Sequence, residues 1–269
     1  DMIFGERRNG CNNEADDGHR ESTPVNKSYA ALQDVDHGDI LPCLEVIEAA
    51  SGHGVPIRMT LIAPLIQSDR VHVVEVVLRL ISNHVSEPLP ECLLAPRFLL
   101  RLAHIVGTCT GDRLMEEAAD LLSCLLWHSQ DHHHRLQSLL DLAHILGQSL
   151  IVHLHDGRDA VSSPVLHCLI RLATWPKDQV ANAISNMIVS QQELIPLVID
   201  ALCAGEFDSE KVAVLSCSLL SEALRREPCL PSCGEIFVDH ASDILKSTMM
   251  ILDLCSPIFV VPVINAVAV

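Results

Sequence analysis

From residue 39 onward, apolar residues recur at every third or fourth position, with polar residues between them. This period predicts amphipathic helices of about 12 to 20 residues, separated by short breaks at Gly, Pro, Asp or Ser. The segment VHVVEVVLRLISN comes closest to a strand, because β-branched residues favour extended structure. Its polar residues recur at helical spacing, at His72, Glu75, Arg79 and Asn83. The pattern therefore predicts an all-α fold.

The predicted helices fall into pairs. Four second helices are expected to begin after an acidic cap, near Asp69, Gly111, Lys177 and Asp208, at steps of 42, 66 and 31 residues. Each follows an apolar helix, in the order PIRMTLIAPLI, APRFLLRLAHIV, SPVLHCLIRLA and QELIPLVIDALC. Steps of about 31 to 42 residues fit repeats built from helical pairs. The longer step leaves room for a degenerate unit across the histidine-rich residues 128–155.

Two of the hairpins carry a Pro-Leu pair in the first helix, then an acidic cap, then a closing pattern in the second helix. These are Pro64-Leu65, Asp69 and Leu80-Ile81-Ser82-Asn83, and then Pro196-Leu197, Asp208 and Leu219-Leu220-Ser221-Glu222. In this pattern the chain resembles armadillo and HEAT repeats across residues 39–269. The resemblance implies a right-handed α-solenoid of stacked helical hairpins, a fold that binds other proteins along one extended face.

The resemblance also implies a row of groove residues. In peptide-binding armadillo proteins an Asn of the last helix grips the peptide backbone, with a Trp one turn earlier. The Asn position falls on Asn83, Cys124, Asn186 and Glu222, and the Trp position on Arg79, Asp120, Asn182 and Ser218. Two Asn and no Trp are present, so recognition of basic nuclear-import peptides in the importin manner is not supported. The alternative is an ordinary solvated face of each helix.

The composition restricts the kinds of molecule that the chain is expected to bind. Aromatic residues make up 3% of the chain, so Leu, Ile, Val and Ala must form the core. A formal charge of -17 repels phosphate backbones, which argues against direct binding of nucleic acid. The 11 cysteines stand singly, mostly within apolar helices. That spacing is typical of reduced thiols and favours the cytoplasm or the nucleus.

The two ends of the chain differ from the middle. Residues 1–38 are polar and acidic, which predicts a disordered leader before a repeat domain at 39–269. The uncharged stretch 254–269 is shorter than a membrane span and contains Pro257 and Pro262, so it predicts a core helix. The apolar end and the start at Asp1 suggest a fragment, truncated at the C-terminus, with a further repeat to follow.

Metal chemistry finds little support in the spacing of histidines and cysteines. His128 and His132 share a helix spacing, but Asp131 is expected to start a new helix between them. His144 is expected to be a core histidine, and residues 153–159 a loop. Another candidate set, with only one histidine, is Cys229, Cys233, Asp239 and His240. We expect no metal and no cofactor.

An HD-type phosphohydrolase is the enzymatic alternative. Its metal-binding order could be matched by His128, His155-Asp156 and Asp200, although Gly157 follows the His-Asp pair and indicates a loop. Ser163-Pro164 has two interpretations, a phosphorylation site or a helix start capped by Ser162 or Ser163. The sequence favours the cap.

The sequence as a whole favours a non-enzymatic scaffold or adaptor that binds another protein, as a peptide or a helix, on a stacked-helix surface. The HD-type hydrolase is the alternative function. A third possibility is a purely structural segment of a larger protein. No direct contact with nucleic acid or membrane is expected.

Overall fold

The computed structural model describes residues 23–33, 40–85, 89–129, 136–191, 193–203 and 210–225, with positions 242, 246 and 249. Every regular element within these residues is a helix, so the chain is all-α as predicted. The chain divides into two compact units, Asp1–Pro56 and Ile57–Val269. The division falls inside the expected single domain 39–269.

The first unit contains a helical hairpin. Helix α1 (Pro24–Gln33) packs against α2 (Ile40–Ser51), and Tyr29, Leu32 and Leu44 are buried between them. We expected α1 to belong to a disordered leader. It forms a helix because two large apolar side chains on one face have α2 to pack against.

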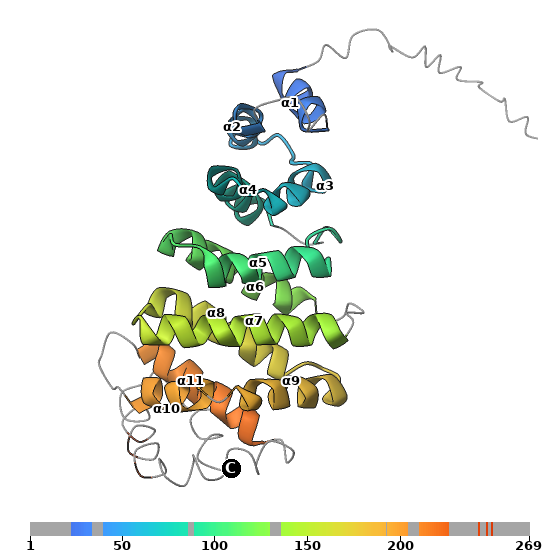
Figure 1. The fold of residues 1–269 in the computed structure, drawn as a ribbon. Coiled ribbons are helices and arrows are strands. Elements are labelled where there is room, and N and C mark those ends of the chain that lie inside the picture. The colour runs from blue at the N-terminus through green and yellow to red at the C-terminus, as the bar shows by residue number, and fades with distance from the viewer. Residues whose placement is uncertain are drawn as a thin grey trace, which may run out of the picture. The chain divides into compact units, whose positions relative to one another are not determined.

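The described part of the second unit contains nine α-helices and one short 3-10 helix, drawn in Figure 1. They are α3 (Met59–Ile62), the short 3-10 helix η1 (Ala63–Gln67), α4 (Val71–His84), α5 (Pro96–Thr108), α6 (Asp112–His128), α7 (Leu136–His155), α8 (Asp159–Ala173), α9 (Asp178–Ser190), α10 (Leu194–Cys203) and α11 (Glu210–Leu224), with η1 set apart from the nine α-helices.

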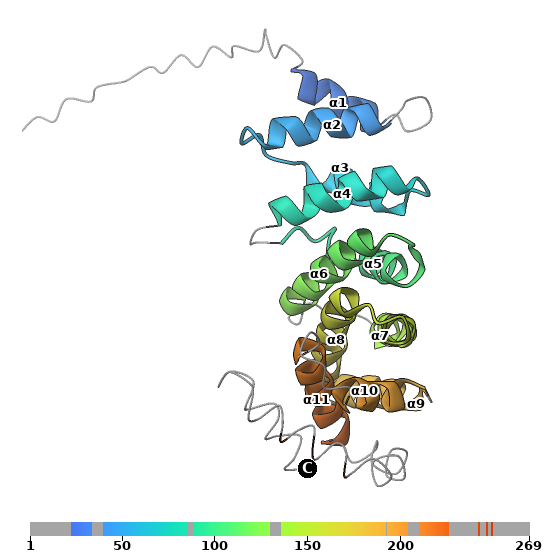
Figure 2. The ribbon, with the colours of Figure 1, turned by 90° about the vertical axis from the view of Figure 1, so that its left-hand side faces the viewer.

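These helices form two layers (Figure 2). Layer A consists of η1, α5, α7, α9 and α10, where α5 contacts η1 and α7, and α7 contacts α9 and α10. Layer B consists of α4, α6, α8 and α11, each in contact with the next. The core lies between the layers and is built from Leu, Ile, Val and Ala, as the composition predicts.

The structure corrects the pairing of two helices. We expected α8 to be the first helix of a hairpin and α9 its second. Instead α8 packs between α6 and α11 in layer B, with α7 as its partner in layer A, and α9 packs on α7. Helices of layer B begin at residues 71, 112, 159 and 210, at steps of 41, 47 and 51 residues. The long predicted step therefore contains a complete hairpin, α7 and α8.

The helix starts differ from the predicted caps. Asp69 is not the cap of α4; the cap residue is Arg70, whose backbone N–H donates to Ser68 Oγ at 3.2 Å. Asp112 and Asp178 lie in the first turns of α6 and α9 instead of preceding them. There they act through the favourable field of the helix N-terminus, not through a side-chain cap.

The Ser-Pro segment also differs from both of its interpretations. Helix α8 begins at Asp159, so Ser162, Ser163 and Pro164 lie inside it. Both serines are buried, at 0% and 4% exposure, because this part of α8 is covered by its neighbours. Neither serine caps the helix, and neither hydroxyl is accessible to a kinase in the folded chain.

No described helix combines the length and the apolar character that crossing a bilayer requires. The predicted apolar helix at 254–269 lies outside the described residues, so this finding does not extend to it. Within the described part the seven cysteines form no disulfide.

Candidate functional site

Trp127 lies at the surface of layer B with 52% of its area exposed. The guanidinium carbon of Arg171 is 3.3 Å from the centroid of the indole ring. Trp127 belongs to the last turn of α6 and Arg171 to that of α8, so the pair joins neighbouring helices. Burial lowers the pKa of Arg171, but a guanidinium stays charged at neutral pH. A cation–π contact at an exposed site contributes about 0.5–1 kcal/mol.

Charged groups on three helices interact beside this pair. Partial burial raises the pKa of Asp120 on α6, while Lys211 on α11 and His167 on α8 oppose that shift. Burial lowers the pKa of His167, and the nearby cations Lys211 and Arg171 lower it further. We refer to Trp127 and these four residues of α6, α8 and α11 as the layer B cluster.

Six of the eight predicted groove residues lie in layer B. Arg79 and Asn83 are on α4, Asp120 and Cys124 on α6, and Ser218 and Glu222 on α11; Asn182 and Asn186 are on α9 in layer A. The eight residues therefore do not form one row. Asn182 and Asn186 lie in the other layer because α8, not α9, is the helix of layer B at this point of the stack.

Sequence reasoning missed the contribution of α8. His167 and Arg171 are one turn apart on this helix, and they interact with Asp120 and Trp127 of α6. The break at Gly157, where the backbone has φ 66, could have marked α8 as a new second helix. Trp127 was missed because an aromatic residue beside an apolar stripe is usually buried.

Several predicted groove residues have local partners. Ser218 Oγ donates to the Val214 carbonyl oxygen at 3.0 Å, within its own helix. Glu222 accepts a charged hydrogen bond from Arg225 Nη2 at 2.6 Å. Partial burial raises the pKa of the Cys124 thiol, which lowers its thiolate fraction at neutral pH but leaves the side chain exposed.

A small cleft of about 140 Å³ opens between α4 and α6 of layer B. Its lining residues are Glu75, Arg79, Arg113, Leu114 and Glu117. Arg113 Nε donates to Glu117 Oε1 at 2.9 Å. The predicted groove residue Arg79 therefore lines a recess of mixed charge, which favours polar contacts over apolar docking.

The histidine-rich stretch does not form one site. His144 is exposed on α7, so its predicted place in the core is wrong. Helix α7 continues to His155, which limits the predicted loop to residues 156–158. Among the described histidines of this stretch, His153 is buried, and its Nε2 donates to the Val106 carbonyl oxygen at 3.0 Å. Residues 132–134 lie outside the described residues.

Metal-binding geometry is absent from the described part of the chain, where no three His, Cys, Asp or Glu side chains are grouped around one point. The residues of the HD-type pattern lie at three separate places: His128 ends α6, His155 ends α7 with Asp156 in the turn after it, and Asp200 lies on α10. The structure does not bring these four residues together. Cys229, Cys233, Asp239 and His240 lie outside the described residues.

Comparison with known proteins adds no family to this geometry. No protein-family model matches the chain, and neither does any curated protein or any solved structure. The packing of helical hairpins is compatible with a helical repeat fold. A functional proposal therefore depends on the geometry of the layer B surface.

Proposed function

We propose that the chain is an armadillo- or HEAT-like α-solenoid that acts as a non-enzymatic scaffold or adaptor. It binds a peptide or a partner helix on the outer face of layer B. The observation that carries this proposal is the exposed Trp127 with Arg171 stacked on it. Trp and Arg are enriched among the residues that dominate binding energy at protein interfaces.

The layer B cluster supplies complementary groups for a protein ligand. Trp127 offers a rigid apolar surface, Arg171 and Lys211 offer donors, and Asp120 offers an acceptor. A peptide or helix with one large apolar side chain next to polar groups matches this arrangement. The proposed setting is the cytoplasm or the nucleus, in keeping with single cysteines such as Cys168 buried in helical faces.

The proposal is tested by quantitative affinity purification from cell extract, with mass spectrometry of the captured proteins. Trp127→Ala and Arg171→Glu should each reduce the capture of the same set of partners at least tenfold. The matched control is Val152→Ala, which changes a 50% exposed residue of α7 in layer A and should leave capture unchanged. Equal capture by all four proteins, with native circular dichroism, would reject the layer B surface.

The two asparagines that the resemblance assigned to one groove sharpen the test. Asn83→Asp alters layer B and Asn186→Asp alters layer A, each by one negative charge. Binding on layer B predicts a loss of capture for Asn83→Asp alone. Loss of capture for Asn186→Asp alone would indicate that the binding site lies on layer A instead.

A further inference from the structure

Two cations of layer B, Arg171 on α8 and Lys211 on α11, are left without a carboxylate. Within the described part of the chain, neither side chain forms an ion pair or a hydrogen bond. By contrast, Arg113, Arg158 and Arg225 each pair with a carboxylate. In a chain with a formal charge of -17, acidic groups are in excess, so two unpaired cations beside one histidine mark a surface that can accept an anion from outside.

Three neighbouring helices present these cations on one face. Helix α8 packs between α6 and α11. His167 and Arg171 lie one turn apart on α8, and Asp120 and Trp127 lie two turns apart on α6, so each pair shares one side of its helix. Lys211 is exposed in the first turn of α11 and is close enough to act electrostatically on both Asp120 and His167. The layer B cluster is therefore one continuous surface.

The stacking on Trp127 orients Arg171 for binding an anion. At 3.3 Å from the ring centroid, the guanidinium must lie flat on the indole, because an edge-on approach would push its nitrogens into the ring. Stacking uses the face of the guanidinium, whereas its N–H groups point outward in its plane. A carboxylate accepts two such N–H bonds side by side. An anion can therefore bind Arg171 without breaking the contact with Trp127.

The charge of the cluster favours a carboxylate as the ligand. Two cations face the one carboxyl group of Asp120, whose pKa is raised by partial burial. Burial and the two cations lower the pKa of His167, which keeps this imidazole neutral at pH 7. The acidic remainder of the chain repels a phosphate group, with about 1.5 to 2 negative charges, more than it repels a carboxylate with one. The surface thus matches a monoanion.

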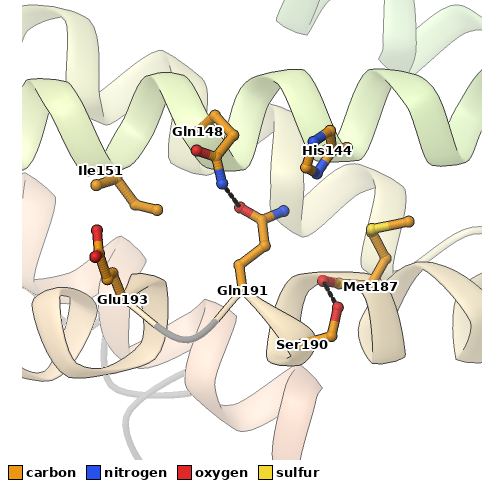
Figure 3. A pocket seen from close by; sticks show the side chains of 7 residues that line it. All are labelled: His144, Gln148, Ile151, Met187, Ser190, Gln191 and Glu193. Carbon is orange, nitrogen blue, oxygen red and sulfur yellow. Dashed lines mark hydrogen bonds between the residues drawn. The ribbon is translucent and has the colours of Figure 1, made fainter.

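The cleft of about 420 Å³ in layer A, drawn in Figure 3, does not offer such a pair of charges. Its two amides bind each other, since Gln148 Nε2 donates to Gln191 Oε1 at 3.3 Å. Gln191 Nε2 is buried against Gly147. The carboxylate among the lining residues is the exposed Glu193. We therefore assign ligand recognition to the layer B cluster and not to this cleft.

We propose that the layer B cluster binds a partner segment in which an acidic residue stands next to a large apolar residue. The carboxylate of that segment pairs with Arg171 and Lys211. The apolar side chain packs on the exposed part of Trp127, which is 52% exposed. Asp120 lies beside the bound carboxylate and opposes it, which limits the site to one acidic group. This inference rests on the proposed binding function of layer B and specifies the charge of the partner.

The direct test is titration of the whole ¹⁵N-labelled chain with acetyl-leucyl-glutamate methylamide in buffer without phosphate. The signal is the indole N–H of Trp127, identified by its loss in Trp127→Phe. We expect saturable shifts. The glutamine counterpart has the same shape without the charge and should bind about fivefold more weakly, and the lysine counterpart more weakly still. Equal affinities for the glutamate and glutamine compounds, absence of saturable shifts, or tighter binding of inorganic phosphate would overturn the proposal.

Single charge changes locate the binding energy. Lys211→Gln should weaken the glutamate compound about threefold and leave the glutamine compound unchanged. Asp120→Asn should strengthen the glutamate compound about twofold, because it removes a like charge. The matched control is Lys177→Gln, which removes the same charge from an exposed lysine before α9 in layer A. An equal loss in Lys177→Gln and Lys211→Gln would reduce the effect to net charge and refute the local pairing.

The failure of this inference differs from the failure of the proposed function. Capture of partners that requires Trp127 but is unchanged in Lys211→Gln would keep the binding function of layer B and overturn the acidic partner. Capture that is unchanged in Trp127→Ala would reject the proposed function itself. Because Lys211 is exposed, Lys211→Gln keeps the test decisive if a variant of the half-buried Arg171 fails to fold.

Discussion

His153 Nε2 donates a hydrogen bond to the Val106 carbonyl oxygen at 3.0 Å and thereby joins α7 to the last turns of α5. His153 is 2% exposed, and the bond requires a proton on Nε2, which the neutral Nε2–H tautomer and the charged imidazolium both carry. Nδ1 is buried and has no partner among the described residues. Protonation would place a second N–H donor at buried Nδ1, so this position favours the uncharged imidazole.

This contact predicts a pH dependence of stability. Burial lowers the pKa of His153 below its ordinary 6.5, and the Val106 carbonyl only partly offsets this; Arg158 lowers the pKa further, while Asp156 and Asp112 raise it. The unfolded chain therefore takes up a proton first. The stabilisation of the folded chain by the neutral His153 imidazole is complete above pH 6.5. It is lost as the pH falls from 6.5 toward the pKa of His153 in the folded chain.

The measurement is urea unfolding of wild type and His153→Gln from pH 7.5 to 5. Below pH 6.5 the free energy of unfolding should fall more steeply for wild type than for the variant. His72→Gln is a suitable control, since its side chain is 83% exposed. Parallel pH profiles for wild type and His153→Gln would contradict the prediction.

Gly147→Ala should destabilise the protein even though alanine favours helices by about 1 kcal/mol. The added methyl group would collide with the Gln191 amide, and such overpacking costs about 1–3 kcal/mol. The double variant Gly147→Ala/Gln191→Ala removes the collision. Its loss of unfolding free energy should therefore be smaller than the sum of the losses in the two single variants. Strictly additive free energies in urea unfolding would show that the two residues do not compete for space.

The stacked pair on layer B can be measured by a double-mutant cycle. We expect Trp127→Ala, Arg171→Ala and the double variant to give a coupling of about 0.5–1 kcal/mol, the size of an exposed cation–π contact. The readout is the free energy of unfolding of all four proteins in one buffer. Coupling indistinguishable from zero would mean that Arg171 does not stabilise the indole in solution.

Thiol labelling should separate Cys124 from Cys168. Cys124 is exposed on α6, whereas Cys168 on α8 is buried and its pKa is raised far above the ordinary 9.0 by desolvation. Iodoacetamide should modify Cys124 in the native protein and Cys168 only after unfolding in urea. Peptide mass spectrometry identifies the sites. Equal native labelling of both thiols would contradict the packing of α8 against α6.

The helix positions could be predicted because each helix has one apolar stripe. In α4, Val73, Val77 and Leu80 are buried at helical spacing, and the period alone revealed them. The layer of each helix could not be predicted in this way. Helices α8 and α9 have similar apolar content, and only their neighbours decide which layer they join. The burial of Ser162 and Ser163 shows that α8 is covered on more sides than its apolar stripe indicates.

In the candidate sites, too, positions within one helix could be predicted from the sequence, whereas contacts between helices could not. Asp120 and Cys124 were predicted on α6 because the armadillo resemblance places its Trp and Asn positions there. The stacking of Arg171 on Trp127 depends on two helices with all of α7 between them in the chain, so local spacing carries no signal for it. Gln191 was missed for a similar reason, since its environment is made by Gly147 on another helix.

The two-layer order has a consequence for how the second unit folds. Its principal contacts join helices that are close along the chain, such as α5 with α6 and α7, or α6 with α8. Low contact order of this kind is associated with fast folding, in microseconds to milliseconds for small helical domains. In repeat proteins built from stacked helical hairpins, structure can start at any hairpin and spread to its neighbours. Damage to the hairpin formed by η1 and α4 should therefore fray one end of the stack and leave the amides of α8 protected from hydrogen exchange.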